Sequence, residues 1–144
     1  MTRNTRADRA AKPSELRSEL SDTLRRAAET GVARSIGIEI RRQRFVSDAT
    51  EVLPTVTGAP DNAPQAQAVL AEDDRHIAEN RRFPYYIMRA PETSRSRRVV
   101  FLFHGLNEKQ WDKYLPWAYS LCRGAGTDVV LFPIAFHMDR ADPS

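Results

Sequence analysis

The first periodic stretch of the chain has the spacing of an amphipathic helix. Apolar residues recur there at every fourth position: Leu16, Leu20, Leu24 and Ala28. This spacing places them on one face of a helix. Ser14 is suited to the N-cap and Gly31 to the position after the last turn, so we predict a helix between them. We expect its apolar face to pack on the rest of the domain, with a partner-binding helix as the alternative.

A period-two pattern follows this helix. Ile36, Ile38 and Ile40 alternate with glycine and charged residues, which predicts a half-buried strand running towards Val46. Residues 47–65 are rich in proline and glycine and predict a loop.

Beyond this loop, Pro64 is suited to open a short helix that runs to Ile77. Glu72, Asp73 and Asp74 would occupy adjacent helical positions, which do not face one site. A solvated acidic face is therefore favoured over a metal cluster.

The C-terminal third contains three strand candidates. Residues 83–88 form one, and the continuous apolar run Val99–Phe103 predicts a central strand buried on both faces. Residues 129–132 form the third. We expect the last two to pair in parallel through a right-handed crossover.

A loop and a helix connect these two strands. Leu106–Tyr114 is the loop, and Pro116 suits the first turn of the helix. The predicted apolar face of the helix comprises Trp117, Ala118, Leu121 and Cys122. Gly124 and Gly126 are expected to end it.

Length and composition bound the class of protein. The chain has 144 residues, of which 41% are hydrophobic, enough for one domain with a core. No apolar run approaches the roughly 18 residues of a membrane span, and the charged N-terminus has no secretory core. The lone Cys122 excludes an internal disulfide framework and a cysteine-based zinc cluster. We therefore predict a cytoplasmic protein with no membrane contact.

The net charge of +3 is unevenly distributed along the chain. Residues 1–46 carry a net +5, residues 47–79 carry −6 and residues 80–144 carry +4. Nucleic-acid binding is disfavoured, because the basic residues are interleaved with acids and lack aromatic neighbours for base stacking.

The glycine and histidine positions exclude several motifs. No two glycines have P-loop spacing, and Gly124 and Gly126 lack the third glycine of a dinucleotide-binding fingerprint. Neither a G-x-S-x-G nor an H-E-x-x-H sequence occurs. We therefore expect no metal and no organic cofactor.

The block from Val99 to Arg140 resembles a group of bacterial α/β-hydrolase-like proteins. It contains an HGLNE loop, a WDKYLPWA helix start and an FPIAFH segment. An apolar strand that ends in His-Gly resembles the third strand of the α/β-hydrolase fold. The resemblance implies an α/β fold with an incomplete hydrolase-like sheet, extending through the strand after the His-Gly loop, and an N-terminal amphipathic helix. The expected organisation is a disordered basic arm (1–12), a region of helix, strand and loop (13–80) and a partial hydrolase-like core (81–144).

The resemblance also assigns roles in the His-Gly loop. Gly105 permits the sharp turn after the strand, and the main-chain N–H of Leu106 would be one donor of an oxyanion hole. His104 is expected to shape the loop and not to act as a base. Asn107 and Glu108 either line a substrate pocket or pin the loop.

The chain departs from the hydrolase pattern because nucleophile, acid and base are missing, so we assign no catalytic residue. Cys122 is expected to be a small buried hydrophobe. His137 and Asp139 could line a pocket as a dyad, but they have no nucleophile to serve. One oxyanion donor contributes about 2.7–4 kcal/mol only when a nucleophile generates the oxyanion.

The expected function is that of a truncated or split α/β-hydrolase-like protein, inactive by itself, whose parent hydrolyses an ester or similar acyl bond. Without an elbow strand, Val99–Phe103 would have one unpaired edge, which is prone to association. A complementing C-terminal polypeptide, or a second copy, is the expected partner. The alternative is a non-enzymatic protein-binding module that uses the N-terminal helix and this edge.

Overall fold

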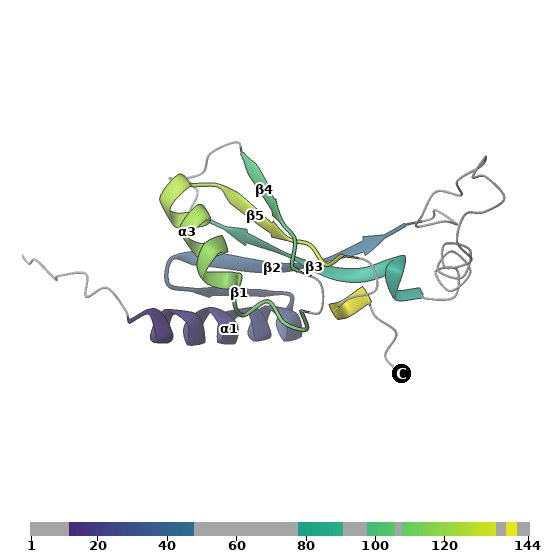
Figure 1. Ribbon diagram of the computed structural model, residues 1–144, viewed down its shortest axis with the longest axis horizontal. Coiled ribbons are helices and arrows are strands. Elements are labelled where there is room, and N and C mark those ends of the chain that lie inside the picture. The colour runs from purple at the N-terminus through teal and green to yellow at the C-terminus, as the bar shows by residue number, and fades with distance from the viewer. Residues whose placement is uncertain (1–11, 48–77, 91–97, 106–107, 135–137, 141–144) are drawn as a thin grey trace, which may run out of the picture.

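The computed structural model describes residues 12–47, 78–90, 98–105, 108–134 and 138–140 (Figure 1). Its elements are α1 (Pro13–Thr30), β1 (Val32–Ser35), β2 (Ile38–Val46), the 3-10 turn η1 (Ala78–Asn80), β3 (Arg82–Arg89), β4 (Val99–Leu102), α3 (Leu115–Ala125), β5 (Asp128–Leu131) and the 3-10 turn η3 (Met138–Arg140). The predicted helix from Pro64 to Ile77, its three acids and the arm before Lys12 lie outside these residues.

The five strands form one mixed sheet in the order β1-β2-β3-β5-β4. β1 and β2, β2 and β3, and β3 and β5 are antiparallel, whereas β4 and β5 are parallel. The predicted α/β class and the predicted parallel strand pair are therefore confirmed. β4 lies at one end of the sheet, with β5 as its only strand partner among the described residues.

The first helix begins and ends at residues suited to those positions. Pro13 occupies the first turn, where its missing N–H leaves no bond unmade, and the Lys12 N–H donates to the Glu15 carboxylate at 3.2 Å. Ser14 is inside the helix, so its assignment as the N-cap was wrong. Gly31 ends the helix as predicted, with φ 85° and its N–H bonded to the Ala27 carbonyl at 2.9 Å.

A hairpin turn interrupts the strand that was predicted from Ile36 onwards. Ile36 and Gly37 have φ of 42° and 75°, as a two-residue turn with positive φ at both positions requires. The strand prediction was wrong at Ile36. Its apolar side chain continues the alternation of the neighbouring residues, and isoleucine is uncommon at the positive φ that this turn requires, so the sequence favoured a strand there. The Tyr119 hydroxyl on α3 donates to the Ile36 carbonyl at 3.4 Å.

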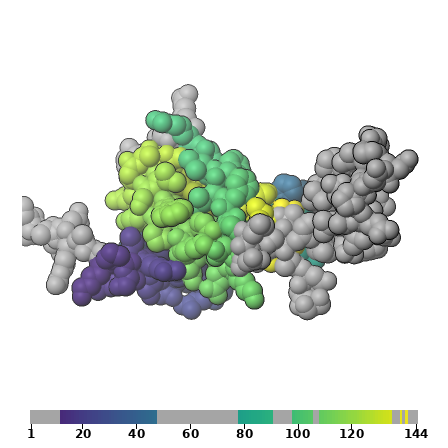
Figure 2. Space-filling model, in the orientation of Figure 1, coloured from purple at the N-terminus to yellow at the C-terminus, as the bar shows by residue number. Residues whose placement is uncertain are grey.

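One face of the sheet is covered by α1 and α3, and we call it the covered face. Strand alternation puts Ile40, Met88 and Leu131 on this face, and all three are fully buried in the main core cluster. The helices contribute residues such as Leu20 and Cys122 to the same cluster. Figure 2 shows the atoms of α1 and α3 side by side at the surface, as their contacts require.

The opposite face, which we call the open face, carries a cluster of aromatic rings. Phe132 contacts the rings of Phe45, Phe83, Tyr85, Phe101 and Phe103 at centroid distances of 5.3–6.4 Å. Phe101 is 57% exposed and Phe103 53% exposed. The prediction of a strand buried on both faces was therefore wrong for Val99–Phe103, because the described helices cover only the opposite face of this strand.

The second helix differs from its prediction at two places. Leu115, Ala118 and Cys122 are buried on its inner side, whereas Trp117 is 65% exposed and does not belong to the buried face. Gly124 lies inside the helix, and Gly126 ends it with φ 62°. No described helix has the length and apolarity needed to cross a membrane.

Candidate functional site

The loop that follows β4 is held by both ring nitrogens of His104. Its Nδ1 lies 2.9 Å from the Gly105 carbonyl oxygen, and its Nε2 accepts the Ile134 N–H at 3.2 Å. A neutral imidazole protonated on Nδ1 satisfies both contacts. The buried ring therefore connects the end of β4 to the segment after β5, and both nitrogens are occupied by the main chain.

Gly105 is anchored by a tyrosine from the start of α3. The Gly105 N–H donates to the Tyr114 hydroxyl at 2.7 Å, and a Cβ at Gly105 would lie 3.3 Å from that oxygen. A larger residue at this position would displace the hydroxyl. Leu106, the resemblance-based oxyanion donor, and Asn107 lie outside the described residues.

Glu108 forms its ion pair within the same loop. Its carboxylate contacts the Lys113 ammonium, and this hydrogen bond raises the pKa of Lys113. The same ammonium lies 5.1 Å from the centre of the Tyr114 ring. These contacts link the two ends of the loop, which favours the pinning role for Glu108 over the pocket-lining role.

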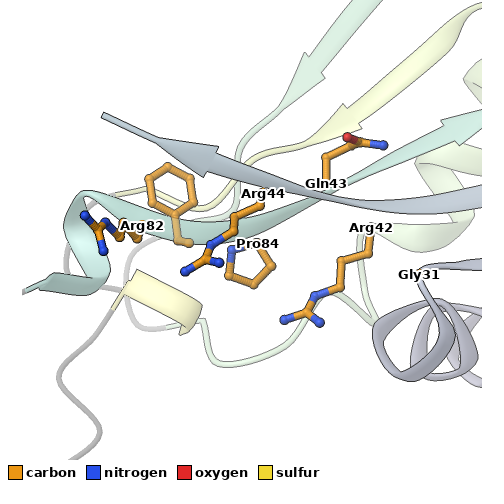
Figure 3. A pocket seen from close by; sticks show the side chains of 7 residues that line it. Gly31, Arg42, Gln43, Arg44, Arg82 and Pro84 are labelled. Carbon is orange, nitrogen blue, oxygen red and sulfur yellow. The ribbon is translucent and has the colours of Figure 1, made fainter. Parts of the chain in front are cut away.

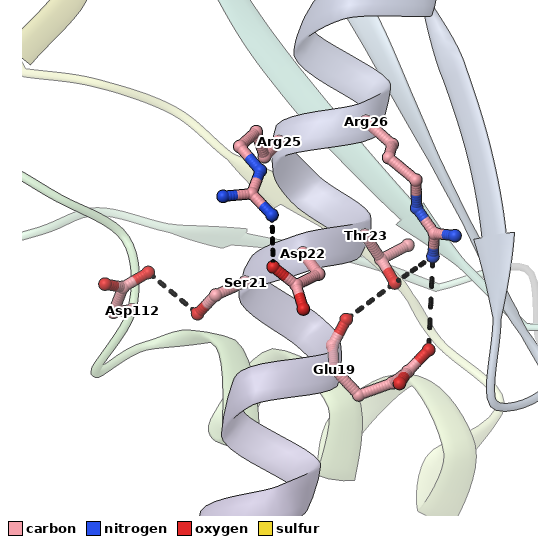
Figure 4. Close-up of polar contacts among 7 residues, drawn as sticks. All are labelled: Glu19, Ser21, Asp22, Thr23, Arg25, Arg26 and Asp112. Carbon is pink, nitrogen blue, oxygen red and sulfur yellow. Dashed lines mark hydrogen bonds and ion pairs between the residues drawn. The ribbon is translucent and has the colours of Figure 1, made fainter.

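An aromatic row and one helix contact hold the base of the loop. Trp111 packs edge-on to His104 at 5.3 Å and to Tyr114 at 6.1 Å between ring centres. Its indole N–H is buried and has no hydrogen-bond partner among the described residues. The Ser21 hydroxyl of α1 donates to the Asp112 carboxylate at 2.9 Å (Figure 4).

The other sequence-predicted residues do not join this loop. Cys122 is fully buried on α3, which confirms its prediction as a buried hydrophobe. His137 lies outside the described residues. Asp139 lies in η3, but its side chain is not among those that the structure describes. Within the described part of the chain, no cluster of three histidine, cysteine or acidic side chains could hold a metal ion.

Sequence reasoning missed the anchoring tyrosine. Tyr114 lies nine residues after Gly105, at no helical or strand spacing from it, so the contact has no periodic signature. The only sequence signal near this contact is the number of aromatic residues between Trp111 and Trp117.

The arrangement provides a rigid turn at the end of a strand whose main chain is fixed from two sides. The N–H groups of Gly105 and Glu108 in this turn are bonded to the Tyr114 hydroxyl and to the Gly105 carbonyl, so neither is available to an anion or a developing oxyanion. The described residues include no side chain at this loop that could act as a nucleophile with an adjacent base.

Comparison with known proteins gives one match. Residues 13–144 match the model of a family of unknown function, DUF6051. Searches of curated proteins and of solved structures give no match. Because the family model spans nearly the whole chain, the protein belongs to the DUF6051 family.

Proposed function

We propose that this chain is the N-terminal part of an α/β-hydrolase-like protein that hydrolyses an ester or related acyl bond. A polypeptide that pairs with β4 would supply the nucleophile, the acid and the base. The observation that carries the proposal is β4, an edge strand with exposed phenylalanines on one face and a His-Gly turn at its end.

The order of the strands supports this proposal. The chain passes from the antiparallel strand β3 to the sheet edge at β4, and then returns through α3 to form β5 between them. A hydrolase-type sheet places its His-Gly strand beside the strand of the nucleophile elbow. In this sheet the position beyond β4 is open among the described strands, so an added strand would lie beside the His-Gly turn.

The exposed apolar surface supports completion by a further polypeptide. Burying a phenylalanine contributes roughly 1.5–3 kcal/mol, and Phe101 and Phe103 are each more than half exposed. A strand added to β4 would also satisfy main-chain groups that have no partner among the described strands on that side. Helices following that strand could cover the two rings.

The anchored turn supports acyl chemistry. Tyr114 fixes Gly105, one residue before the proposed donor Leu106, and His104 fixes the same turn from the other side. The proposed role requires the Leu106 N–H to be held in position, because a preorganised donor loses no free energy to reorganisation when the oxyanion forms.

The test is to read the frames that follow codon 144 and to co-express any polypeptide with an elbow sequence, an acid and a late histidine. The co-expressed complex should hydrolyse p-nitrophenyl butyrate, and residues 1–144 alone should not. Tyr114→Phe should lower kcat by about tenfold or more, short of the roughly 10²–10³-fold lost on removing an oxyanion donor. Tyr119→Phe, which removes a hydroxyl bonded to the hairpin turn, is the matched control.

A second candidate function, protein binding by strand addition, is favoured by the same exposed edge. A stoichiometric complex through β4 that has no hydrolytic activity would support this candidate and contradict the first. Equal loss of activity in the Tyr114 and Tyr119 variants would contradict the role given to the anchored turn.

A further inference from the structure

A hollow of about 560 Å³ lies where the cover of α1 ends. Its walls include Gly31, which ends the helix, and Pro84 of β3. Three arginines line it: Arg42 and Arg44 from β2 and Arg82 from β3 (Figure 3). This feature is separate from the loop after β4 and does not depend on the proposed hydrolase role.

Strand register explains why the three arginines share one side of the sheet. Arg42 and Arg44 are two residues apart on β2, so they point to the same face, and Figure 3 shows Gln43 on the other side. Arg44 pairs with Pro84, which puts Arg82 diagonally across from Arg44. Typical spacings are about 6.6–6.8 Å along a strand and about 7–8 Å along such a diagonal.

The three side chains carry positive charge without acidic partners. All three are exposed, and none forms an ion pair in the described part of the chain. Arg42 donates to the Ala28 carbonyl at 3.3 Å, near the negative end of the α1 dipole.

Several other described arginines form ion pairs with nearby carboxylates. Arg25 pairs with Asp22, and Arg34 and Arg41 both pair with Glu39. The hollow is therefore a place where positive charge is concentrated on β2 and β3 without such neutralisation.

We propose that this hollow binds a small molecule carrying two or more linked phosphate groups. The planar guanidinium donates two parallel hydrogen bonds to a phosphate, and three of them spaced along two strands suit more than one phosphate. The volume falls within the roughly 300–1,000 Å³ typical of small-molecule sites.

The composition of the hollow favours this ligand over single-stranded nucleic acid. Bases bind to proteins by stacking on accessible aromatic rings. The one aromatic residue of the lining, Phe83, is 1% exposed, and its ring packs against Phe45 at 4.8 Å and lies 4.2 Å from the Arg140 guanidinium. A base entering the hollow would find phosphate-binding groups and no free ring.

The test is calorimetric titration of residues 1–144 with inorganic pyrophosphate at low salt. We expect one binding site, with affinity weakened about tenfold or more in Arg44→Gln, the arginine between the other two. Arg44→Lys keeps the charge but loses the pair of parallel hydrogen-bond donors. Its affinity for pyrophosphate should lie between those of the wild type and Arg44→Gln. Arg17→Gln is the matched control, because Arg17 is exposed on α1, outside the hollow, and its loss changes net charge equally.

Circular dichroism of each variant establishes that it is folded, which is expected because Arg44 is exposed. Unchanged affinity in Arg44→Gln, equal weakening in Arg17→Gln, or absence of pyrophosphate binding would overturn the proposal. Tighter binding of an oligothymidine than of pyrophosphate, lost in Arg44→Gln, would also overturn it in favour of a nucleic-acid surface.

Discussion

The two faces of the sheet both carry large apolar side chains but differ in what covers them. On the covered face, Ile40, Met88 and Leu131 are fully buried beneath α1 and α3. On the open face, Phe101 and Phe103 are each more than half exposed. The same strands contribute to both faces, so the difference lies in the layer outside the sheet and not in the strands.

The covered face is the one whose burial stabilises the described domain, and the open face is the one available for contact with a partner. Burial of the covered face under two helices provides the hydrophobic stabilisation. Phe101 and Phe103 each contact the Phe132 ring edge-on, but an exposed apolar patch of this kind marks an interaction surface. Substitutions on the two faces should therefore change different properties.

The largest expected effect is on the covered face. Leu131→Ala should lower the free energy of unfolding by about 2–5 kcal/mol, because it leaves a cavity at a fully buried position. Phe101→Ala should change it by less than about 1 kcal/mol in the isolated chain, since the ring is mostly in solvent. Urea unfolding of both variants measures this difference. Equal losses of unfolding free energy would contradict the different roles given to the two faces.

The next effect concerns association through the open face. We expect the isolated chain to self-associate, and Phe101→Lys to weaken this by about 1.5–3 kcal/mol through loss of a buried ring. Trp117→Lys is the control, because Trp117 is 65% exposed on α3, on the other side of the sheet. Sedimentation equilibrium distinguishes the two variants. If the wild type were monomeric at all concentrations, the open face would be stable in solvent and the predicted association would be contradicted.

A smaller effect is expected where the helical cover ends. Gly31 has φ 85° and open space around its Cβ position, so Gly31→Ala should cost about 1–2 kcal/mol through backbone strain alone. Gly124 also has open space but lies inside α3 with no positive φ, so Gly124→Ala should stabilise by about 0.8–1.0 kcal/mol. Thermal unfolding compares the pair, and a shared sign would contradict the assignment of strain to Gly31.

Sequence reasoning could predict the covered face because its layers carry local periodicity. The four-residue spacing from Leu16 to Ala28 specifies α1, and Gly31 specifies its end. The pairing of β4 with β5 followed from the short helical crossover between them. These are features of neighbouring residues, which a single sequence displays.

The errors have a common physical origin in long-range context. Val99–Phe103 has the composition of a buried strand, yet its burial depends on a layer that no local pattern encodes. Ile36 continues the alternation of its neighbours, yet it forms the turn of a hairpin. In the loop after β4, the His-Gly turn was predictable, whereas its anchor Tyr114 depends on how α3 begins.

The smallest effect concerns the polar end of the open face, where Glu39 lies between Arg34 and Arg41. The hydrogen bond from Arg41 is the main cause that lowers the pKa of Glu39 below its ordinary value of 4.5; burial opposes it, and Arg34 adds to the lowering. A lowered pKa in the folded state stabilises the fold above pH 4.5, and this contribution is lost as the pH falls through the folded pKa. Arg41→Gln should therefore raise the pKa of Glu39 and make unfolding less sensitive to pH below 4.5.

Arg34→Gln should raise the pKa of Glu39 less than Arg41→Gln does, because its hydrogen bond is the weaker cause. The loss of stability in both variants should be largest near neutral pH, where Glu39 is ionised, and should stay within about 1 kcal/mol, since both arginines are well exposed. Carboxyl-carbon NMR titration of Glu39 gives the three pKa values. If Arg34→Gln raised the pKa of Glu39 more than Arg41→Gln does, Arg34 of β1 would be its main partner and the assignment to Arg41 would be contradicted.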